Sequence, residues 1–169
     1  YLHNHKPRII HRDVKPDNVM VRWGQDFHVW LMDLGVAHAI VKPRARNSVV
    51  GTQYFACPEQ LRGENPDPRM DVFSLGTTLY FVMRDYQTGP DDRYPPFPFE
   101  RRDGPEEIEH NLRSCSSYGD RLKDIVIKAM AYDARDRYQS AEEMQQALRG
   151  LVQGNVQSAH PLAGSVVTP

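Results

Sequence analysis

The sequence predicts a mainly α-helical fold with one small β-hairpin near its N-terminus. Three observations support this prediction: two short β-rich runs within residues 18–33, an apolar segment at residues 70–83, and later segments with helical periodicity. The chain has 169 residues, enough for one domain of ordinary size or for part of a larger one.

The hairpin is predicted from two apolar runs and the turn between them. Residues 19–21 form a short run, residues 23–26 contain a glycine and an aspartate typical of a turn, and residues 29–32 form the second run. Residues 35–51 are rich in basic and small polar side chains. We expect a loop there that becomes ordered only when its function requires it.

A buried helix and an amphipathic helix are predicted further along the chain. Residues 70–83 are apolar on nearly every side of a helix, which is typical of a buried one. Residues 90–98 contain four prolines and predict a stiff connecting loop. Residues 119–131 show an apolar stripe with helical spacing, formed by Leu122, Ile125, Val126, Ala129 and Met130.

A capping box predicts the start of the last helix. The Ser140 hydroxyl can accept from the N–H of Glu143, and the Glu143 carboxylate can reach back to the N–H of Ser140. The helix then buries Met144, Ala147, Leu148 and Leu151. The apolar period is lost after Gly154. We place the domain at residues 1–150 and a disordered tail or linker at residues 151–169.

Composition narrows the possible partners and the setting. The 21 Lys and Arg residues nearly balance the 22 Asp and Glu residues, so we expect neither nucleic acid nor a lipid surface as the main partner. The sequence has no run of about 18 apolar residues, so we expect no membrane-spanning segment in this chain. The two cysteines favour a reducing, cytoplasmic setting. Since the chain starts at Tyr1, we expect a piece of a longer protein, which could be membrane-anchored beyond Pro169.

The residues with catalytic potential flank the predicted hairpin. Residues 11–18 read His-Arg-Asp-Val-Lys-Pro-Asp-Asn, and Asp33 ends the second strand. The oxygen atoms of Asn18 and Asp33 suit Mg²⁺, which leaves Asp13 to orient a hydroxyl group. Phosphoryl transfer needs this division of labour, since its catalysis is mostly positioning and charge neutralisation. Each motif alone could be an ordinary solvated turn, but their combination favours a phosphoryl-transfer site.

These motifs resemble the C-terminal lobe of a eukaryotic-type (Hanks-type) protein kinase, and bacterial serine/threonine members in particular. The resemblance covers roughly residues 1–150. Five segments carry it in the family's order: residues 11–18, 33–35, 51–59, 71–76 and 137–144. The implied fold is the α+β kinase fold without its N-terminal lobe.

The resemblance implies part of a protein serine/threonine kinase, which transfers the γ-phosphate of ATP to hydroxyl groups of a protein substrate. Asp13 would accept or orient the hydroxyl proton, and Lys15 would neutralise charge on the transferred group and help to bind the nucleotide. Asn18 and Asp33 would hold Mg²⁺. Lysine at position 15 is typical of serine/threonine members rather than tyrosine kinases.

The resemblance also implies structural roles for four residues. His11 would support the catalytic loop from within the core rather than carry protons. Asp71 would accept hydrogen bonds from the loop backbone, and Glu59 would pair with Arg137. Cys57, which stands where the family has a smaller residue, is expected to be a packed side chain rather than a reactive thiol.

Three residues are implied in regulation. An arginine beside the base, here Arg12, is typical of kinases switched by phosphorylation of the activation loop. Ser48 lies where such kinases often carry the phosphate, which Arg12 and nearby basic residues could bind. Ser48 could equally be an unmodified loop residue. The resemblance makes residues 51–59 the platform for the protein substrate, and Thr52 would hydrogen-bond near Asp13 and Lys15 and so connect this substrate platform to the base.

The chain contains neither a Gly-x-Gly-x-x-Gly loop nor a Val-Ala-x-Lys strand, which in this family belong to the N-terminal lobe. We therefore expect the isolated 169 residues to have negligible kinase activity and to expose an apolar face. Two alternatives remain: a pseudokinase or scaffold that binds partners, and a small-molecule phosphotransferase of the aminoglycoside or choline type. The second usually lacks Arg12 and the segment 51–59.

Overall fold

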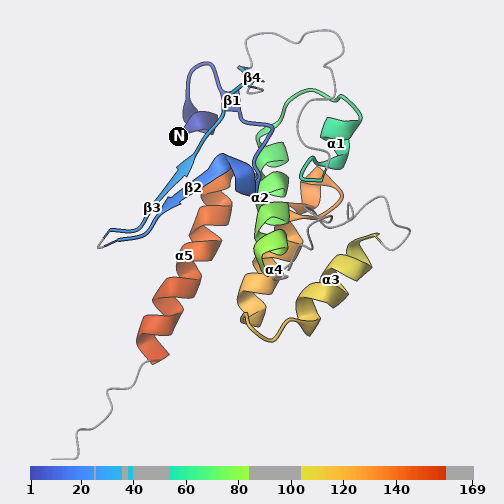
Figure 1. Cartoon of the computed structure of the whole chain (residues 1–169). Helices are drawn as coiled ribbons and strands as arrows, with labels where there is room; N and C mark the ends of the chain where they lie inside the picture. Colours follow the sequence, from blue (N-terminus) through green and yellow to red (C-terminus); the bar gives the residue numbers. More distant parts are fainter. Residues whose placement is uncertain (25, 36–37, 40–53, 84–103, 159–169) are drawn as a thin grey trace, which may run out of the picture.

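The computed structural model describes residues 1–24, 26–35, 38–39, 54–83 and 104–158, and within this part it is mostly helical (Figure 1). In chain order the elements are η1 (Leu2–Asn4), β1 (Ile9–Ile10), η2 (Pro16–Asn18), β2 (Val19–Arg22), β3 (His28–Leu31), β4 (His38–Ala39), α1 (Pro58–Leu61), α2 (Pro68–Met83), α3 (Gly104–Ser114), α4 (Asp120–Ala129), η3 (Ala134–Asp136) and α5 (Ala141–Ser158). The predicted fold class, mainly α with a small antiparallel hairpin, is confirmed.

The hairpin is formed by β2 and β3. The strands are antiparallel, with Val19 opposite Leu31 and Arg22 opposite His28. A second two-stranded sheet pairs β1 with β4, with Ile9 opposite Ala39. This second pairing was not predicted, because two residues per strand are too few for a periodic signal in the sequence.

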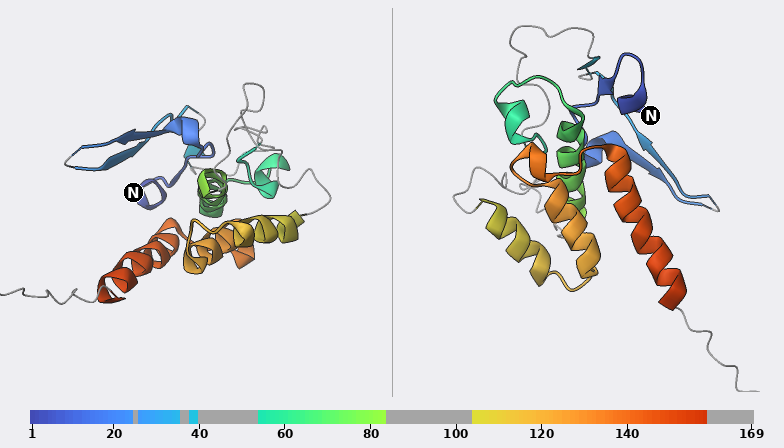
Figure 2. Two further views of the ribbon diagram at one scale, coloured as in Figure 1. Left: turned by 60° about the horizontal axis from the view of Figure 1, so that its bottom comes forward. Right: turned by 180° about the vertical axis from the view of Figure 1, so that it is seen from behind.

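Helix α2 forms the centre of the fold. Figure 2 shows it above a layer made by α3, α4 and α5, with the hairpin on one side and α1 on the other. Its side chains Met70, Val72 and Phe73 are almost completely buried. The prediction of a buried helix is therefore confirmed, although Val82 near its end is 55% exposed.

The capping box before α5 is present with one difference. The Ser140 hydroxyl accepts from the N–H of Glu143 at 3.1 Å. The Glu143 carboxylate accepts from the N–H of Gln139 at 2.6 Å, one residue earlier than predicted. Helix α5 continues to Ser158, beyond residue 150 where we placed the start of a tail.

Helix α3 was missed by the sequence analysis. Its apolar signal rests on Ile108 and Leu112, which are 4% and 0% exposed and lie one turn apart. Pro105 in the first turn is typical of a helix start and could have indicated it. The proline-rich stretch 90–98 lies outside the described residues. None of the described helices has both the length and the hydrophobicity needed to cross a membrane.

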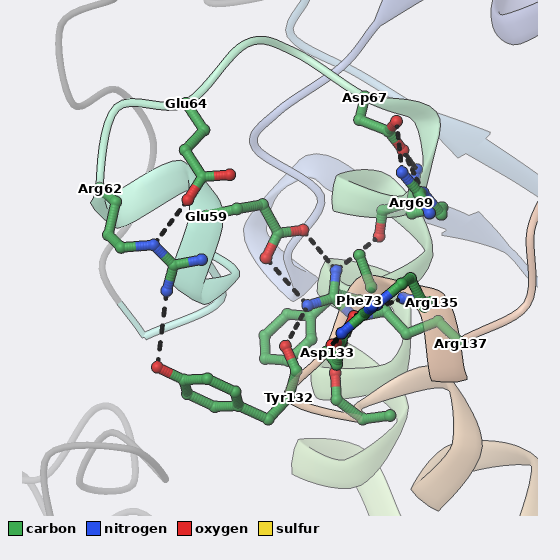
Figure 3. Close-up of polar contacts among 12 residues, drawn as sticks. Glu59, Arg62, Glu64, Asp67, Arg69, Phe73, Tyr132, Asp133, Arg135 and Arg137 are labelled. Atoms are coloured by element: carbon green, nitrogen blue, oxygen red, sulfur yellow. Dashed lines mark hydrogen bonds and ion pairs between the residues drawn. The ribbon is translucent and has the colours of Figure 1, made fainter.

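A buried ion pair attaches α1 to the segment before α5 (Figure 3). Two nitrogens of Arg137 donate to the two carboxylate oxygens of Glu59, at 2.5 and 2.9 Å. The same guanidinium donates to the carbonyl oxygens of Ala131 and Tyr132, and it lies 4.7 Å from the ring centre of Phe73. The pair that the family resemblance implied is therefore formed in this structure, and its charges are satisfied on both sides.

The pKa of Glu59 is set by two opposing effects. Burial by itself raises the pKa of this carboxyl group, but the hydrogen bonds and the charge of Arg137 outweigh burial. As a result, the pKa of Glu59 in the folded protein lies below its ordinary value.

The close contact between α2 and α4 yields a first prediction. A methyl group added at Gly76 would lie 2.8 Å from Cβ of Ala129 and 3.0 Å from Cγ of Met130, so Gly76→Ala should destabilise the fold by about 1–3 kcal/mol. Gly150→Ala in α5 is the matched control. Nothing lies within 4 Å of its added methyl group, and it should stabilise the fold by up to about 1 kcal/mol. Urea unfolding measures both, and equal stability of Gly76→Ala and wild type would contradict the packing described.

The lowered pKa of Glu59 yields a second prediction, on pH dependence. A carboxyl group whose pKa falls on folding contributes stability at neutral pH, and this contribution is lost as the pH falls through the folded-state pKa. The difference in unfolding free energy between wild type and Glu59→Gln should therefore be largest near pH 7 and shrink below pH 4.5, the ordinary pKa.

Glu64→Gln is the control for this titration, because Glu64 pairs with Arg62 at the surface and its side chain is 51% exposed. Its effect on stability should be small at every pH. A gap between wild type and Glu59→Gln that stays constant from pH 7 to pH 3.5 would contradict the assignment.

Candidate active site

The loop that follows β1 is hydrogen-bonded to a side chain in the first turn of α2. The carboxylate of Asp71 accepts from the backbone N–H groups of His11 and Arg12, both at 2.8 Å. The Nε2 atom of His3 lies 2.7 Å from the same carboxylate. The contacts expected for Asp71 are thus present, and His3 is an additional partner that the sequence analysis did not identify.

Arg12 has an unusual backbone conformation within this loop. Its φ angle is 68°, in the left-handed region that side chains other than glycine rarely adopt. The residue is 7% exposed. Burial lowers the pKa of its guanidinium below the ordinary value, and the nearby charge of Asp71 opposes this shift. The charged side chain next to the proposed base is therefore part of the core rather than a surface group.

Asp13 lies at the centre of a small polar cluster. Its Oδ2 atom is 3.0 Å from the ammonium group of Lys15. The side-chain amide of Asn18 donates to the Asp13 carbonyl oxygen at 2.8 Å and to Oδ2 at 3.0 Å. The structure thus brings together three of the residues predicted for catalysis, and the Asp13 carboxylate has a fixed direction.

His11 connects this cluster to the end of the hairpin. Its side chain is fully buried, and its Nδ1 atom accepts from the N–H of Asp13 at 3.3 Å. The other ring nitrogen, Nε2, therefore carries the proton and donates to the carbonyl oxygen of Met32 at 3.0 Å. The N–H of Met32 in turn donates to the carbonyl oxygen of Asn18 at 2.8 Å. These two bonds hold the residue before Asp33 against the loop that contains Asp13.

Asp33 begins a tight turn directly after β3. Its φ angle is 62°, and its Oδ1 atom accepts from the N–H of Gly35 at 2.9 Å. A side chain at position 35 would bring a Cβ atom within 2.8 Å of that same oxygen, so the Asp33 side chain would have to shift. Asp33 itself is exposed. The turn presents a carboxylate to solvent, and the backbone of the preceding residue, Met32, is hydrogen-bonded to His11 and Asn18.

The donor atoms fit a magnesium ion of the kind expected from the sequence. Both amide hydrogens of Asn18 are used toward Asp13, which leaves the amide oxygen as the group available to a cation. The exposed Asp33 carboxylate offers a second hard oxygen donor on the neighbouring turn. Mg²⁺ is usually held by one or two protein groups, with water and phosphate oxygens completing its shell. The described residues contain no cluster of three or more His, Cys, Asp or Glu side chains that could hold a metal.

The remaining predicted site residues lie elsewhere. Ser48 and Thr52 are outside the described residues. Cys57 is fully buried, and burial followed by the neighbouring Glu59 raises the pKa of its thiol well above the ordinary value. A protonated, inaccessible thiol agrees with a packed residue, as expected.

The hairpin beside the site has apolar side chains exposed on both faces. Neighbouring residues of a strand point to opposite faces, and in both strands consecutive apolar residues are exposed. These exposed side chains are Met20, Val21, Val29, Trp30, Leu31 and Met32. Leu34 in the following turn is 53% exposed as well. An apolar surface of this extent usually marks a contact with another part of the protein or a partner.

Comparison with known proteins agrees with this geometry. The family model described as the protein kinase domain matches residues 1–149. Serine/threonine-protein kinase PknB of Mycolicibacterium smegmatis is 34% identical over 169 residues, covering 92% of this chain and 25% of that protein. PknB of Mycobacterium tuberculosis is 36% identical over 148 residues, covering 83% of this chain and 22% of that protein.

A probable serine/threonine-protein kinase of Clostridium perfringens, CPE1738, is 34% identical over 150 residues, covering 83% of this chain and 20% of that protein. The chain thus spans about a quarter of the length of these curated relatives or somewhat less. Since the family model covers most of the chain, the chain belongs to the protein kinase domain family.

Proposed function

We propose that this chain is part of a protein serine/threonine kinase that uses ATP and Mg²⁺ to phosphorylate a protein substrate. The observation that carries the proposal is the cluster in which Lys15 and Asn18 both contact the Asp13 carboxylate. Its relatives named PknB are described as serine/threonine-protein kinases, which supports the same activity.

The contacts of these residues support the following roles. The carboxylate of Asp13 takes the proton of a substrate hydroxyl while that oxygen bonds to the γ-phosphorus and the bond to the leaving ADP oxygen breaks. The Lys15 ammonium lies beside the carboxylate and neutralises charge on the transferred group. Asn18 and Asp33 would hold Mg²⁺, which when bound would supply positive charge to the phosphate oxygens.

We also propose that the chain supplies the C-terminal lobe of this kinase and that another part of the protein covers the hairpin. The support is the apolar surface on β2 and β3, where Val29 is 55% exposed and Met20 is 49% exposed. Burying such side chains typically stabilises a protein by about 25 cal/mol per Å². ATP would bind between the two parts, and the kinase domain would work in a reducing, cytoplasmic setting. Both cysteines, Cys57 and Cys115, are free thiols.

Regulation by phosphorylation belongs to the same proposal. A phosphate on Ser48 would bring about −1.5 to −2 charges, which the guanidinium of Arg12 could bind. Thr52 would connect the substrate platform to Asp13 and Lys15. The position of Arg12 directly before the base supports this role, because a bound phosphate there would act directly on the loop that holds Asp13.

The proposal predicts a specific loss of activity in the full-length protein. Asp13→Asn keeps the size of the side chain but removes the group that takes the proton, so kcat should fall by about 10²–10⁴-fold. The measurement is transfer of radiolabelled phosphate from Mg-ATP to a generic protein substrate such as casein.

Asp26→Asn in the exposed hairpin turn is the matched control and should keep the wild-type rate. A full-length protein that turns over no faster than its Asp13→Asn variant would contradict the kinase assignment. That result would favour a scaffold that only binds partners.

A further inference from the structure

One buried contact links helix α1 directly to the catalytic loop. The side-chain amide of Gln60 donates to the carbonyl oxygen of Arg12 at 2.7 Å. Gln60 is 2% exposed, so this hydrogen bond forms away from water. A buried bond between an amide and a backbone carbonyl has a defined direction and is costly to break, since its partners cannot turn to solvent.

The carbonyl that Gln60 binds belongs to the peptide group immediately before the proposed base. The nitrogen of that same peptide group is the N–H of Asp13, which donates to Nδ1 of His11 at 3.3 Å. Both polar atoms of the peptide are therefore held by buried side chains, Gln60 on one side and His11 on the other. The orientation of this peptide helps to set the direction in which the Asp13 side chain leaves the backbone.

This peptide also follows a residue in a rarely populated conformation. The left-handed φ of Arg12 persists only where surrounding contacts hold it. Asp71 holds the N–H of Arg12 at 2.8 Å, and Gln60 holds its carbonyl oxygen. Loss of either contact would allow the loop to relax toward an ordinary conformation and would turn the Asp13 carboxylate.

The other end of the connection is firmly anchored. Gln60 follows Glu59, whose carboxylate is bound by two nitrogens of the buried Arg137. Helix α1 contains Pro58 and Glu59, the last two residues of segment 51–59, which the resemblance makes the substrate platform. A displacement of this platform would therefore move Gln60 and, through its buried hydrogen bond to Arg12, the backbone next to Asp13.

We propose that Gln60 is a positioning residue that couples the placement of α1 to the orientation of Asp13. This inference rests on the kinase function proposed above. It adds that the end of the substrate platform and the catalytic loop act as one unit, and that the Gln60 amide is the contact that joins them.

The test compares two glutamine variants in the full-length protein. Gln60→Met keeps the side-chain length but removes the donor, and kcat should fall at least tenfold while KM for ATP changes by less than about twofold. The rate is expressed per nucleotide site, counted by the stoichiometry of ADP binding, so that a smaller folded fraction cannot imitate the effect.

Gln139→Met is the matched control. The amide of Gln139 also donates to backbone carbonyls, those of Ala134, Arg135 and Arg137 at 3.2, 3.1 and 2.7 Å, but at an exposed position outside the loop. Its kcat should equal that of wild type. A wild-type kcat per nucleotide site in Gln60→Met would overturn the proposal. If Gln60→Met does not fold, Gln60→Asn, whose amide is one methylene shorter, replaces it with the same expectations.

A second readout does not depend on activity. Crystal structures of the wild-type and Gln60→Asn proteins should differ in the peptide between Arg12 and Asp13, with the Asp13 carboxylate moved away from Lys15. An unchanged peptide and carboxylate would overturn the positioning role. If the wild-type protein shows no kinase activity, the proposed function fails, and the crystal structures still decide whether Gln60 orients Asp13.

Discussion

The geometry of the site depends on one buried carboxylate, that of Asp71 at the start of α2. It accepts two backbone N–H groups from the loop and so holds Arg12 in its left-handed conformation. Hydrogen bonds to a charged acceptor are about twice as strong as those between neutral groups. Without this acceptor, two buried N–H groups would be unsatisfied, and the turn that presents Asp13 would have no support.

The loop held by Asp71 makes two further sets of contacts. His11 and Asn18 connect the loop to Met32, which places Asp33 at the same end of the hairpin as the base. Gln60 connects the loop to α1, which the Glu59–Arg137 pair attaches to the rest of the domain. The proposed catalytic residues are thus held by contacts from three separate stretches of the chain. Pre-organisation of this kind is what phosphoryl transfer requires, because the protein contributes mainly position and charge.

The sequence predicted the hairpin, the central helix and the cluster around Asp13, because each has a strong local pattern. It missed α3, whose buried face rests on Ile108 and Leu112, and it missed the pairing of β1 with β4, since contacts between distant short segments leave no local period. The role of His3 was also missed, because its partner Asp71 is 68 residues away. Motif spacing predicted which residues would carry the chemistry, but the side chains that hold them became visible only in three dimensions.

The most direct test of this account is the rate of phosphoryl transfer by a full-length protein with Asp71→Asn. The asparagine retains one carboxamide oxygen but presents an NH₂ group to the other loop N–H, so at least one of the two bonds is lost. We expect the rate to fall by about 10²-fold, because the Asp13 carboxylate is no longer held in position. A folded Asp71→Asn protein with the wild-type rate would contradict the claim that this buried carboxylate sets the geometry of the site.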